Sequence, residues 1–199
     1  FELPLIKMSS RLLIMLLPAM LLTVSCVQQK TKTDFFSLEL QTLDHETFSF
    51  QILESGKATA IIFLQPECPF CNSYGKTLRQ LDSAITKAGI TFIAVVAGKN
   101  YPEEEIKVYR EHNRFTFPIL LDPDFVLQKR LNAIITPEVF LVNNKGETLY
   151  RGLIDNWAYE IGKVRPMVSE HYLMDAVTAF LKNRPIQPDS TKAIGCYIE

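Results

Sequence analysis

The chain has 199 residues, of which 47% are hydrophobic and 22% are charged, and its formal net charge at pH 7 is −1. This length suits one well-packed domain preceded by a leader and is short for two domains. The near-neutral charge gives no sign of a nucleic-acid partner or of binding to an anionic membrane surface. The four cysteines are more informative than this bulk composition.

Residues 1–25 are predicted to be a leader, with the true start at Met8. After Met8 come a basic residue, Arg11, an apolar run over 12–24, and then Ser and Cys26. This is the three-part layout of a secretory signal. A membrane span needs about 20 apolar residues, so the run is too short for a comfortable span.

The leader ends in Thr-Val-Ser-Cys26, which resembles the lipid-attachment box of bacterial lipoproteins, although Thr23 stands where Leu is usual. In such a box the cysteine is lipidated and becomes the mature N-terminus. A plain cleaved signal and an uncleaved anchor are the alternatives. All three place the domain outside the cytosol. The first predicts lipidation at Cys26, a polar tether over 26–34, and a domain over 35–199 that faces the periplasm.

The first half of the domain contains strand and helix patterns in alternation. Residues 35–53 alternate loosely around an Asp-His pair, which predicts a short hairpin or two edge strands. The apolar run 58–64 is typical of a strand buried on both faces. Over 72–88 the apolar residues recur at steps of three and four, which predicts a helix that Gly89 ends. The run 90–97 predicts a second buried strand.

The second half continues this alternation. Residues 100–113 carry a proline and then three acids, which favours a helix start. A short strand is predicted within 117–122 and a short helix within 124–133. Residues 136–152 predict two strands around an Asn-Lys-Gly turn, and 169–185 predict a helix that ends at a proline. The expected fold is therefore α/β, with helices on both faces of a central sheet.

The pair Cys68-Pro69-Phe70-Cys71 lies where a strand ends and a helix begins. Free N–H groups at a helix N-terminus stabilise an anion, so we expect a lowered pKa and an accessible thiolate at Cys68. Cys71 lies one turn further on and is expected to be less exposed. It can attack a mixed disulfide on Cys68 and release the substrate. Pro69 fits the first helical turn because no N–H donor is needed there.

Other roles for this pair fit less well. A zinc site needs four ligands, and haem attachment needs a His where Asn72 stands. A structural disulfide across so short a loop would constrain little of the unfolded chain. Thiolates also suit Cu(I), which leaves a copper carrier as a third hypothesis, although no His or Met lies nearby in the sequence. The remaining candidates for zinc are scattered: Cys196, His45, His112 and His171. Redox exchange is favoured, with no metal site.

Three stretches resemble a known family: 63–81 around the cysteine pair, 136–142 and 146–155. They are similar to thioredoxin-fold proteins of the redoxin group, which holds thiol–disulfide oxidoreductases and peroxiredoxin-like proteins. The resemblance covers roughly 35–199, and the end of the chain resembles a bacterial subgroup with a C-terminal Gly-Cys-x-Ile motif. It implies a thioredoxin-like fold with a central mixed sheet, no bound cofactor, protein thiols or disulfides as substrates, and a redox partner protein.

The resemblance also assigns a role to Thr136-Pro137. In this family a cis-proline lies opposite the active cysteines, and a cis X–Pro bond costs only about 0.5–1 kcal/mol over trans. The loop before it would hold an incoming chain as an extended strand close to the reactive sulfur. The alternative is an ordinary proline at the start of a strand.

Two positions near the cysteines depart from the family. Thioredoxins carry a buried Asp six residues before the first cysteine, whereas this chain has Ile62. Many relatives have Trp just before that cysteine, and Glu67 replaces it. Glu67 could relay protons, raise the pKa of Cys68 by like charge, or be a solvated loop acid. Together with Pro69 and Phe70 it is predicted to support the cysteine pair.

The peroxiredoxin pattern is incomplete. Peroxiredoxins need Thr three residues and Pro seven residues before the peroxidatic cysteine, where this chain has Gln65 and Ile61. A thiol peroxidase using Cys68 is therefore the second hypothesis, and it rests on subgroup similarity. Peroxiredoxins also need a nearby cation, for which the candidates are Arg114, Arg151 and Arg165. Each of these also fits a surface charge.

Cys196 has three possible roles in an oxidising compartment. It could pair with a partner protein, join the redox exchange as a third thiol, or stay a free residue of a mobile tail. The apolar residues around its Gly-Cys pair favour docking onto the domain. The sequence thus predicts an extracytoplasmic thiol–disulfide oxidoreductase in which Cys68 attacks, Cys71 resolves and Thr136-Pro137 positions the substrate.

Overall fold

The computed structural model describes residues 1–2 and 33–199. The predicted leader from residue 3 onward, most of the tether, and Cys26 lie outside the described residues. The chain separates into two units, Phe1–Lys30 and Thr31–Glu199, and all described helices and strands belong to the second. None of these helices has the length and hydrophobicity that crossing a bilayer requires.

A seven-stranded sheet runs through the domain in the order β2-β1-β5-β4-β3-β7-β8. Strands β3, β4 and β5 are parallel, and the others join antiparallel, so the predicted mixed sheet is confirmed. The strands are β1 (Glu39–Thr42), β2 (Thr47–Ser49), β3 (Ala58–Phe63), β4 (Thr91–Ala97), β5 (Ile119–Asp122), β7 (Glu138–Asn143) and β8 (Thr148–Gly152).

The central strands are apolar throughout because both faces of the sheet are covered. In β3, Ala60 and Ile62 belong to one hydrophobic cluster, whereas Ile61 and Phe63 belong to the other. This alternation follows from the period of two of a strand, whose successive side chains point to opposite faces. The run of β3 is therefore continuously apolar because its residues face two buried sides of the sheet in alternation.

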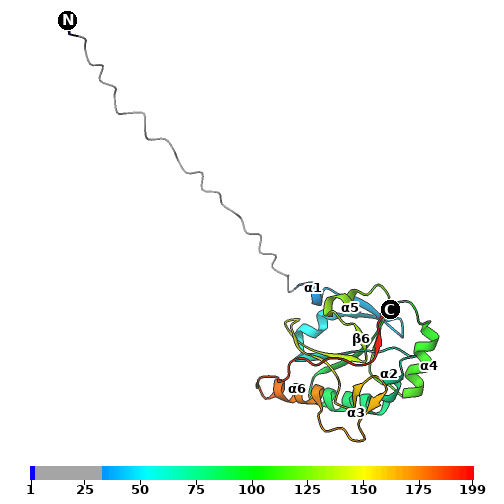
Figure 1. Ribbon diagram of the computed structural model, residues 1–199. Coiled ribbons are helices and arrows are strands. Elements are labelled where there is room, and N and C mark those ends of the chain that lie inside the picture. The colour runs from blue at the N-terminus through cyan, green and yellow to red at the C-terminus, as the bar shows by residue number, and fades with distance from the viewer. Residues whose placement is uncertain (3–32) are drawn as a thin grey trace. The chain divides into compact units, whose positions relative to one another are not determined.

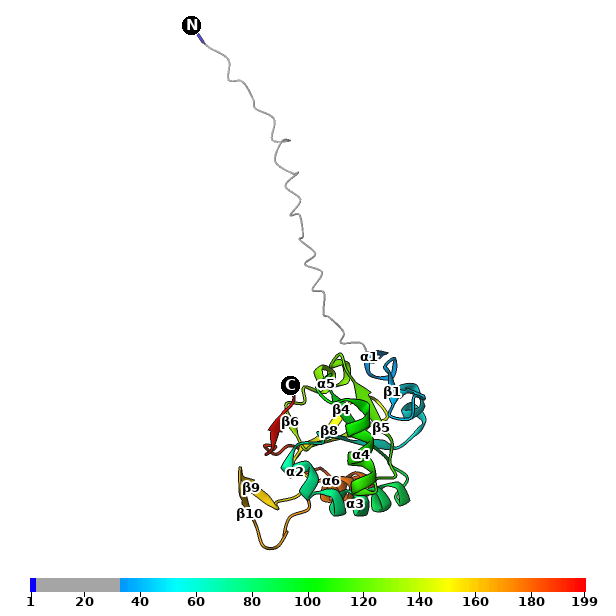
Figure 2. The ribbon, with the colours of Figure 1, turned by 90° about the vertical axis from the view of Figure 1, so that its right-hand side faces the viewer.

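Helices cover both faces of the sheet, as predicted (Figures 1 and 2). One face is covered by α2 (Pro69–Ser73), α3 (Gly75–Lys87), α4 (Glu103–Asn113) and α6 (Tyr172–Leu181). The opposite face is covered by α1 (Thr33–Phe36), the 3-10 helix η1 (Phe50–Ser55) and α5 (Val126–Leu131). The described domain is thus a three-layer α/β fold of the thioredoxin type.

Three short elements differ from the sequence-based expectation. The hairpin β1–β2 is confirmed, but its second arm continues as η1, because Phe50 and Leu53 are buried three residues apart and a 3-10 turn brings both inward. A small hairpin of β9 (Ala158–Glu160) and β10 (Lys163–Val164) projects from the domain (Figure 2). The last pair joins β6 (Ile135–Thr136) to β11 (Cys196–Tyr197) at the C-terminus.

Candidate active site

The cysteine pair lies at the predicted junction. Cys68 is the N-cap of α2, and Pro69 is the first helical residue. Cys71 lies inside the helix with none of its surface exposed. The chain passes at Tyr74 into α3, which ends before Gly89, whose φ is +76. Cys68 therefore lies just beyond the C-terminal end of β3, a central strand of the sheet, and α2 places Cys71 one helical turn after it.

The Thr136–Pro137 peptide bond is cis, as the resemblance implies, and it lies against Cys68. The sulfur of Cys68 is 3.3 Å from the carbonyl oxygen of Thr136, to which the protonated thiol donates. The hydroxyl of Thr136 donates to the side-chain oxygen of Gln65 at 2.7 Å. The backbone before the cis-proline is therefore held within reach of the first sulfur.

The two thiols of the pair differ strongly in acidity. A hydrogen bond from the Cys71 thiol is the largest cause that lowers the pKa of Cys68, to about 5. Burial opposes this effect, and the Cys196 thiol and the backbone N–H of Cys71 add to it. Burial raises the pKa of Cys71 well above its usual value. The expected lowering is present, but the neighbouring thiol contributes more to it than the helix N-terminus does. Near neutral pH, Cys68 is the thiolate and Cys71 holds a proton.

Cys68 is less accessible than expected, since only 2% of it is exposed. The cause is the C-terminal tail, whose strand β11 pairs antiparallel with β6 and places Cys196 opposite Thr136. The N–H of Ile198 donates to the carbonyl of Ile134 at 2.9 Å and extends this pairing. The predicted docking of the tail is confirmed, and the alternative of a free tail residue is wrong in this structure.

The predicted supporting residues surround the pair. Pro69 is exposed, and Glu67 is exposed at the rim of a hollow of about 270 Å³ that Cys68 and Cys196 also line. The half-buried ring of Phe70 lies edge-on to Trp157, with 6.4 Å between the ring centroids. Whether Glu67 relays protons stays a prediction.

Gln65 is a site residue that sequence reasoning missed. It is 4% exposed, and its amide nitrogen donates to the carbonyl of Tyr197 at 3.2 Å while its oxygen accepts from Thr136. It therefore links the cis-proline segment to the tail. At the position where peroxiredoxins have Thr, this chain thus has a glutamine that hydrogen-bonds to both segments. The sequence offers no periodic signal for it, because its two partners are 71 and 132 residues away.

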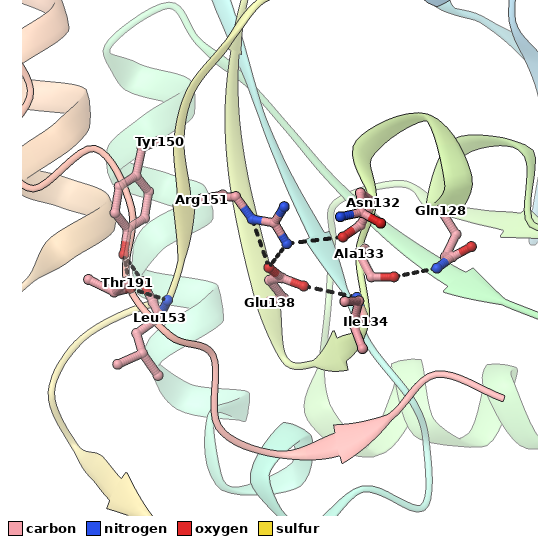
Figure 3. Close-up of polar contacts among 9 residues, drawn as sticks. All are labelled: Gln128, Asn132, Ala133, Ile134, Glu138, Tyr150, Arg151, Leu153 and Thr191. Carbon is pink, nitrogen blue, oxygen red and sulfur yellow. Dashed lines mark hydrogen bonds and ion pairs between the residues drawn. The ribbon is translucent and has the colours of Figure 1, made fainter.

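Arg151 was a candidate for the peroxide-binding cation, but its guanidinium is paired elsewhere (Figure 3). It donates to the Glu138 carboxylate at 2.6 and 3.2 Å and to the Asn132 carbonyl at 3.0 Å. The other oxygen of Glu138 accepts from the N–H of Ile134 at 3.1 Å. This network therefore fixes the backbone of Ile134, the residue just before β6. No group of three or more His, Cys, Asp or Glu in the described part of the chain is placed to hold a metal ion.

Comparisons with known proteins identify relatives of this arrangement. The model of the AhpC/TSA family matches residues 31–151. The sporulation thiol-disulfide oxidoreductase A of Bacillus subtilis is 26% identical over 132 residues, which cover 66% of this chain and 72% of that protein.

Two solved structures share the fold. An uncharacterised conserved protein from Geobacillus kaustophilus has a TM-score of 0.71 at 24% identity, and the match covers 82% of this chain and 89% of that one. A secreted Mycobacterium tuberculosis disulfide oxidoreductase homologous to E. coli DsbE has a TM-score of 0.56 at 21% identity, with coverage of 73% and 98%. These two likenesses establish the thioredoxin-type fold.

Proposed function

Because the chain belongs to the AhpC/TSA family, we propose that it is a thiol–disulfide oxidoreductase in which Cys68 and Cys71 exchange electrons with protein thiols. The observation that carries the proposal is the acidity difference within the pair. Cys68 has a pKa of about 5, whereas the pKa of Cys71 is well above its usual value. A nucleophilic thiolate beside a protonated second thiol is what two-step disulfide exchange requires.

The reaction proceeds in two exchanges. The Cys68 thiolate attacks one sulfur of a substrate disulfide, so a mixed disulfide forms and the other substrate sulfur leaves as a thiolate. Cys71 then attacks the Cys68 sulfur, the mixed disulfide breaks, and the second substrate thiol is released. The substrate is thereby reduced by two electrons, and the pair becomes the Cys68–Cys71 disulfide. A redox partner protein restores the dithiol, or the pair runs in reverse as an oxidant.

The segment 134–136 supports this proposal as the docking edge for a protein substrate. An extended chain can add to an exposed strand edge through backbone hydrogen bonds. The edge ends at the cis-proline, and the carbonyl of Thr136 lies 3.3 Å from the Cys68 sulfur. A substrate cysteine in such a strand would meet Cys68 once β11 has left this edge.

Reduction of insulin disulfides, with dithiothreitol as electron donor, tests the function. We expect the wild type to accelerate the reaction, Cys68→Ser to fall to the rate of dithiothreitol alone, and Cys71→Ser to fall well below the wild-type rate. Ser83→Ala, on the exposed face of α3, is the control and should retain the wild-type rate. Wild-type activity in either cysteine variant would contradict the dithiol mechanism.

A thiol peroxidase using Cys68 is the alternative within the same family. It needs only the first thiol, so hydrogen peroxide consumption that survives Cys71→Ser with an external thiol would favour it. Stoichiometric copper that stays bound through gel filtration would instead favour the third hypothesis, a copper carrier. The disulfide exchange is preferred because Gln65, at the position of the peroxiredoxin Thr, and Arg151, one of the three candidate cations, are engaged with other partners.

We further propose an extracytoplasmic location with a lipid anchor on Cys26. The support is the signal-like leader and its Thr-Val-Ser-Cys end. When the full chain is expressed in a bacterium, we expect it in the membrane fraction, labelled by fatty acid. Cys26→Ser should lose the label and leave the membrane. Retention of Cys26→Ser in the membrane would indicate an uncleaved anchor, and an unlabelled, released wild type would indicate a plain cleaved signal.

A further inference from the structure

The C-terminal tail is built into the site, although it lies beyond the residues that the family model matches. Its first anchor is Thr191, whose N–H donates to the Arg151 carbonyl at 3.0 Å. The Thr191 hydroxyl accepts from the N–H of Leu153 at 2.8 Å and lies 2.8 Å from the hydroxyl of Tyr150 (Figure 3). These contacts direct the following residues across the end of the sheet.

The second anchor is the docking edge itself. Cys196 and Tyr197 pair with Thr136 and Ile135, and the Gln65 amide donates to the Tyr197 carbonyl. The tail therefore occupies the edge that the proposed mechanism assigns to a protein substrate. A strand added to this edge by another protein would make the same kind of backbone contacts.

Gly195 allows this close approach. A Cβ atom on residue 195 would lie 1.9 Å from the carbonyl oxygen of Thr136, a distance that no side chain can occupy. Glycine is the residue that permits such contact between backbones. The Gly-Cys pair therefore sets the next residue, Cys196, opposite Thr136, whose carbonyl also contacts Cys68.

The two cysteines line the same hollow of about 270 Å³. Hydrogen bonding from the Cys196 thiol is one of the causes that lower the pKa of Cys68. Burial, followed by the Cys68 hydrogen bond and charge, raises the pKa of Cys196 to about 12. Cys196 therefore keeps its proton near neutral pH and donates it toward the Cys68 thiolate.

We infer that Cys196 is a third redox thiol, which the tail presents to Cys68 as an internal substrate strand so that the two sulfurs form a disulfide. This inference rests on the proposed function. When Cys68 carries a mixed disulfide with an outside thiol, Cys196 attacks the Cys68 sulfur. The bond to the outside sulfur breaks, the Cys68–Cys196 bond forms, and the proton of Cys196 ends on the departing thiol.

Cys71 carries out the next exchange. It attacks the Cys68 sulfur, so the Cys68–Cys196 bond breaks and the Cys68–Cys71 disulfide forms. The sulfur of Cys196 leaves and takes the proton that Cys71 gives up, which restores the thiol. No oxidant is needed beyond the disulfide that first reacted with Cys68.

Glutathionylation of the full chain tests the inference. In Cys71→Ser, oxidised glutathione should modify Cys68, and the adduct should convert to a Cys68–Cys196 disulfide that non-reducing peptide mapping identifies. In Cys71→Ser/Cys196→Ser the adduct should persist for roughly tenfold longer or more, because a thiol held in place reacts as an intramolecular group. Equal lifetimes of the two adducts would overturn the inference.

Gly195→Ala in the Cys71→Ser background is the matched control, because it keeps both thiols and disturbs only the strand. Its adduct should live nearly as long as that of the double cysteine variant. Gln65→Ala, which removes the side-chain bond to Tyr197, should lengthen the lifetime in the same direction. If both variants convert as fast as Cys71→Ser, the tail geometry is irrelevant and the inference fails.

The proposed function and the role of Cys196 as a third thiol can be tested separately. Insulin reduction by the wild type and its loss in Cys68→Ser are read as rates and test the oxidoreductase, whereas the Cys68–Cys196 bond is read by mass. An active wild type whose Cys71→Ser variant never forms that bond would overturn the third thiol and leave the oxidoreductase intact.

Discussion

Cys71→Ala is expected to raise the pKa of Cys68, which is about 5 in the wild type, by roughly 1 to 2 pKa units. The hydrogen bond from the Cys71 thiol is the largest cause of the low value, and alanine has no donor to replace it. Hydrogen bonds to charged groups contribute roughly 1.5–3 kcal/mol. One pKa unit corresponds to about 1.4 kcal/mol, so the loss of this bond gives the stated change.

The measurement is the rate of alkylation of reduced Cys68 by iodoacetamide as a function of pH. The thiolate reacts, so the rate should rise with pH and level off above the pKa. The midpoint should therefore move to higher pH in Cys71→Ala. Cys71→Ser is the control, because its hydroxyl can still donate to the sulfur and should keep most of the lowering. Identical profiles for the alanine variant and the wild type would show that Cys71 does not set this acidity.

The same experiment tests which group carries the thiolate. Cys196, with a pKa of about 12, should remain unmodified near neutral pH, whereas Cys68 should react. The absolute rate should be limited by the tail, since Cys68 is buried under β11. Mapping the modified peptides therefore distinguishes the effect of each thiol's pKa from the effect of its burial on the alkylation rate.

Local sequence patterns predicted the parts of this site that short stretches of chain determine. The strand over 58–63, the helix start at Pro69 and the cysteine spacing follow from period and position along the chain. The cis bond before Pro137 could be predicted only through the family resemblance. These features together place a reactive thiol beside a backbone edge.

Contacts between distant residues could not be predicted in the same way. Gln65 contacts Tyr197, and Glu138 contacts Arg151, through side chains that fit no helical or strand period. The Gly-Cys pair indicated docking, but not where. Its partner is the two-residue strand β6, which is too short to produce an alternating pattern. Such pairings are decided by tertiary geometry, which a single sequence does not display.

Glu138→Ala is expected to lower the free energy of unfolding by about 3 kcal/mol, at the low end of the range for breaking a buried ion pair. The Glu138 side chain is 4% exposed, and it neutralises Arg151 and accepts from the N–H of Ile134. The variant leaves a guanidinium and a backbone donor without this partner. Arg151 is 33% exposed, so water compensates part of its loss.

Chemical denaturation of the reduced domain measures this loss, with two variants for comparison. Glu160→Ala removes the exposed pair with Lys163 and should cost at most about 1 kcal/mol, because solvent screens surface pairs. Glu138→Gln keeps an acceptor for Ile134 and should fall between the two. Since this carboxylate supports the start of β6, Glu138→Ala should also loosen the tail and speed alkylation of Cys68. A stability no lower than that of Glu160→Ala would mean that the buried carboxylate does not support the docking edge.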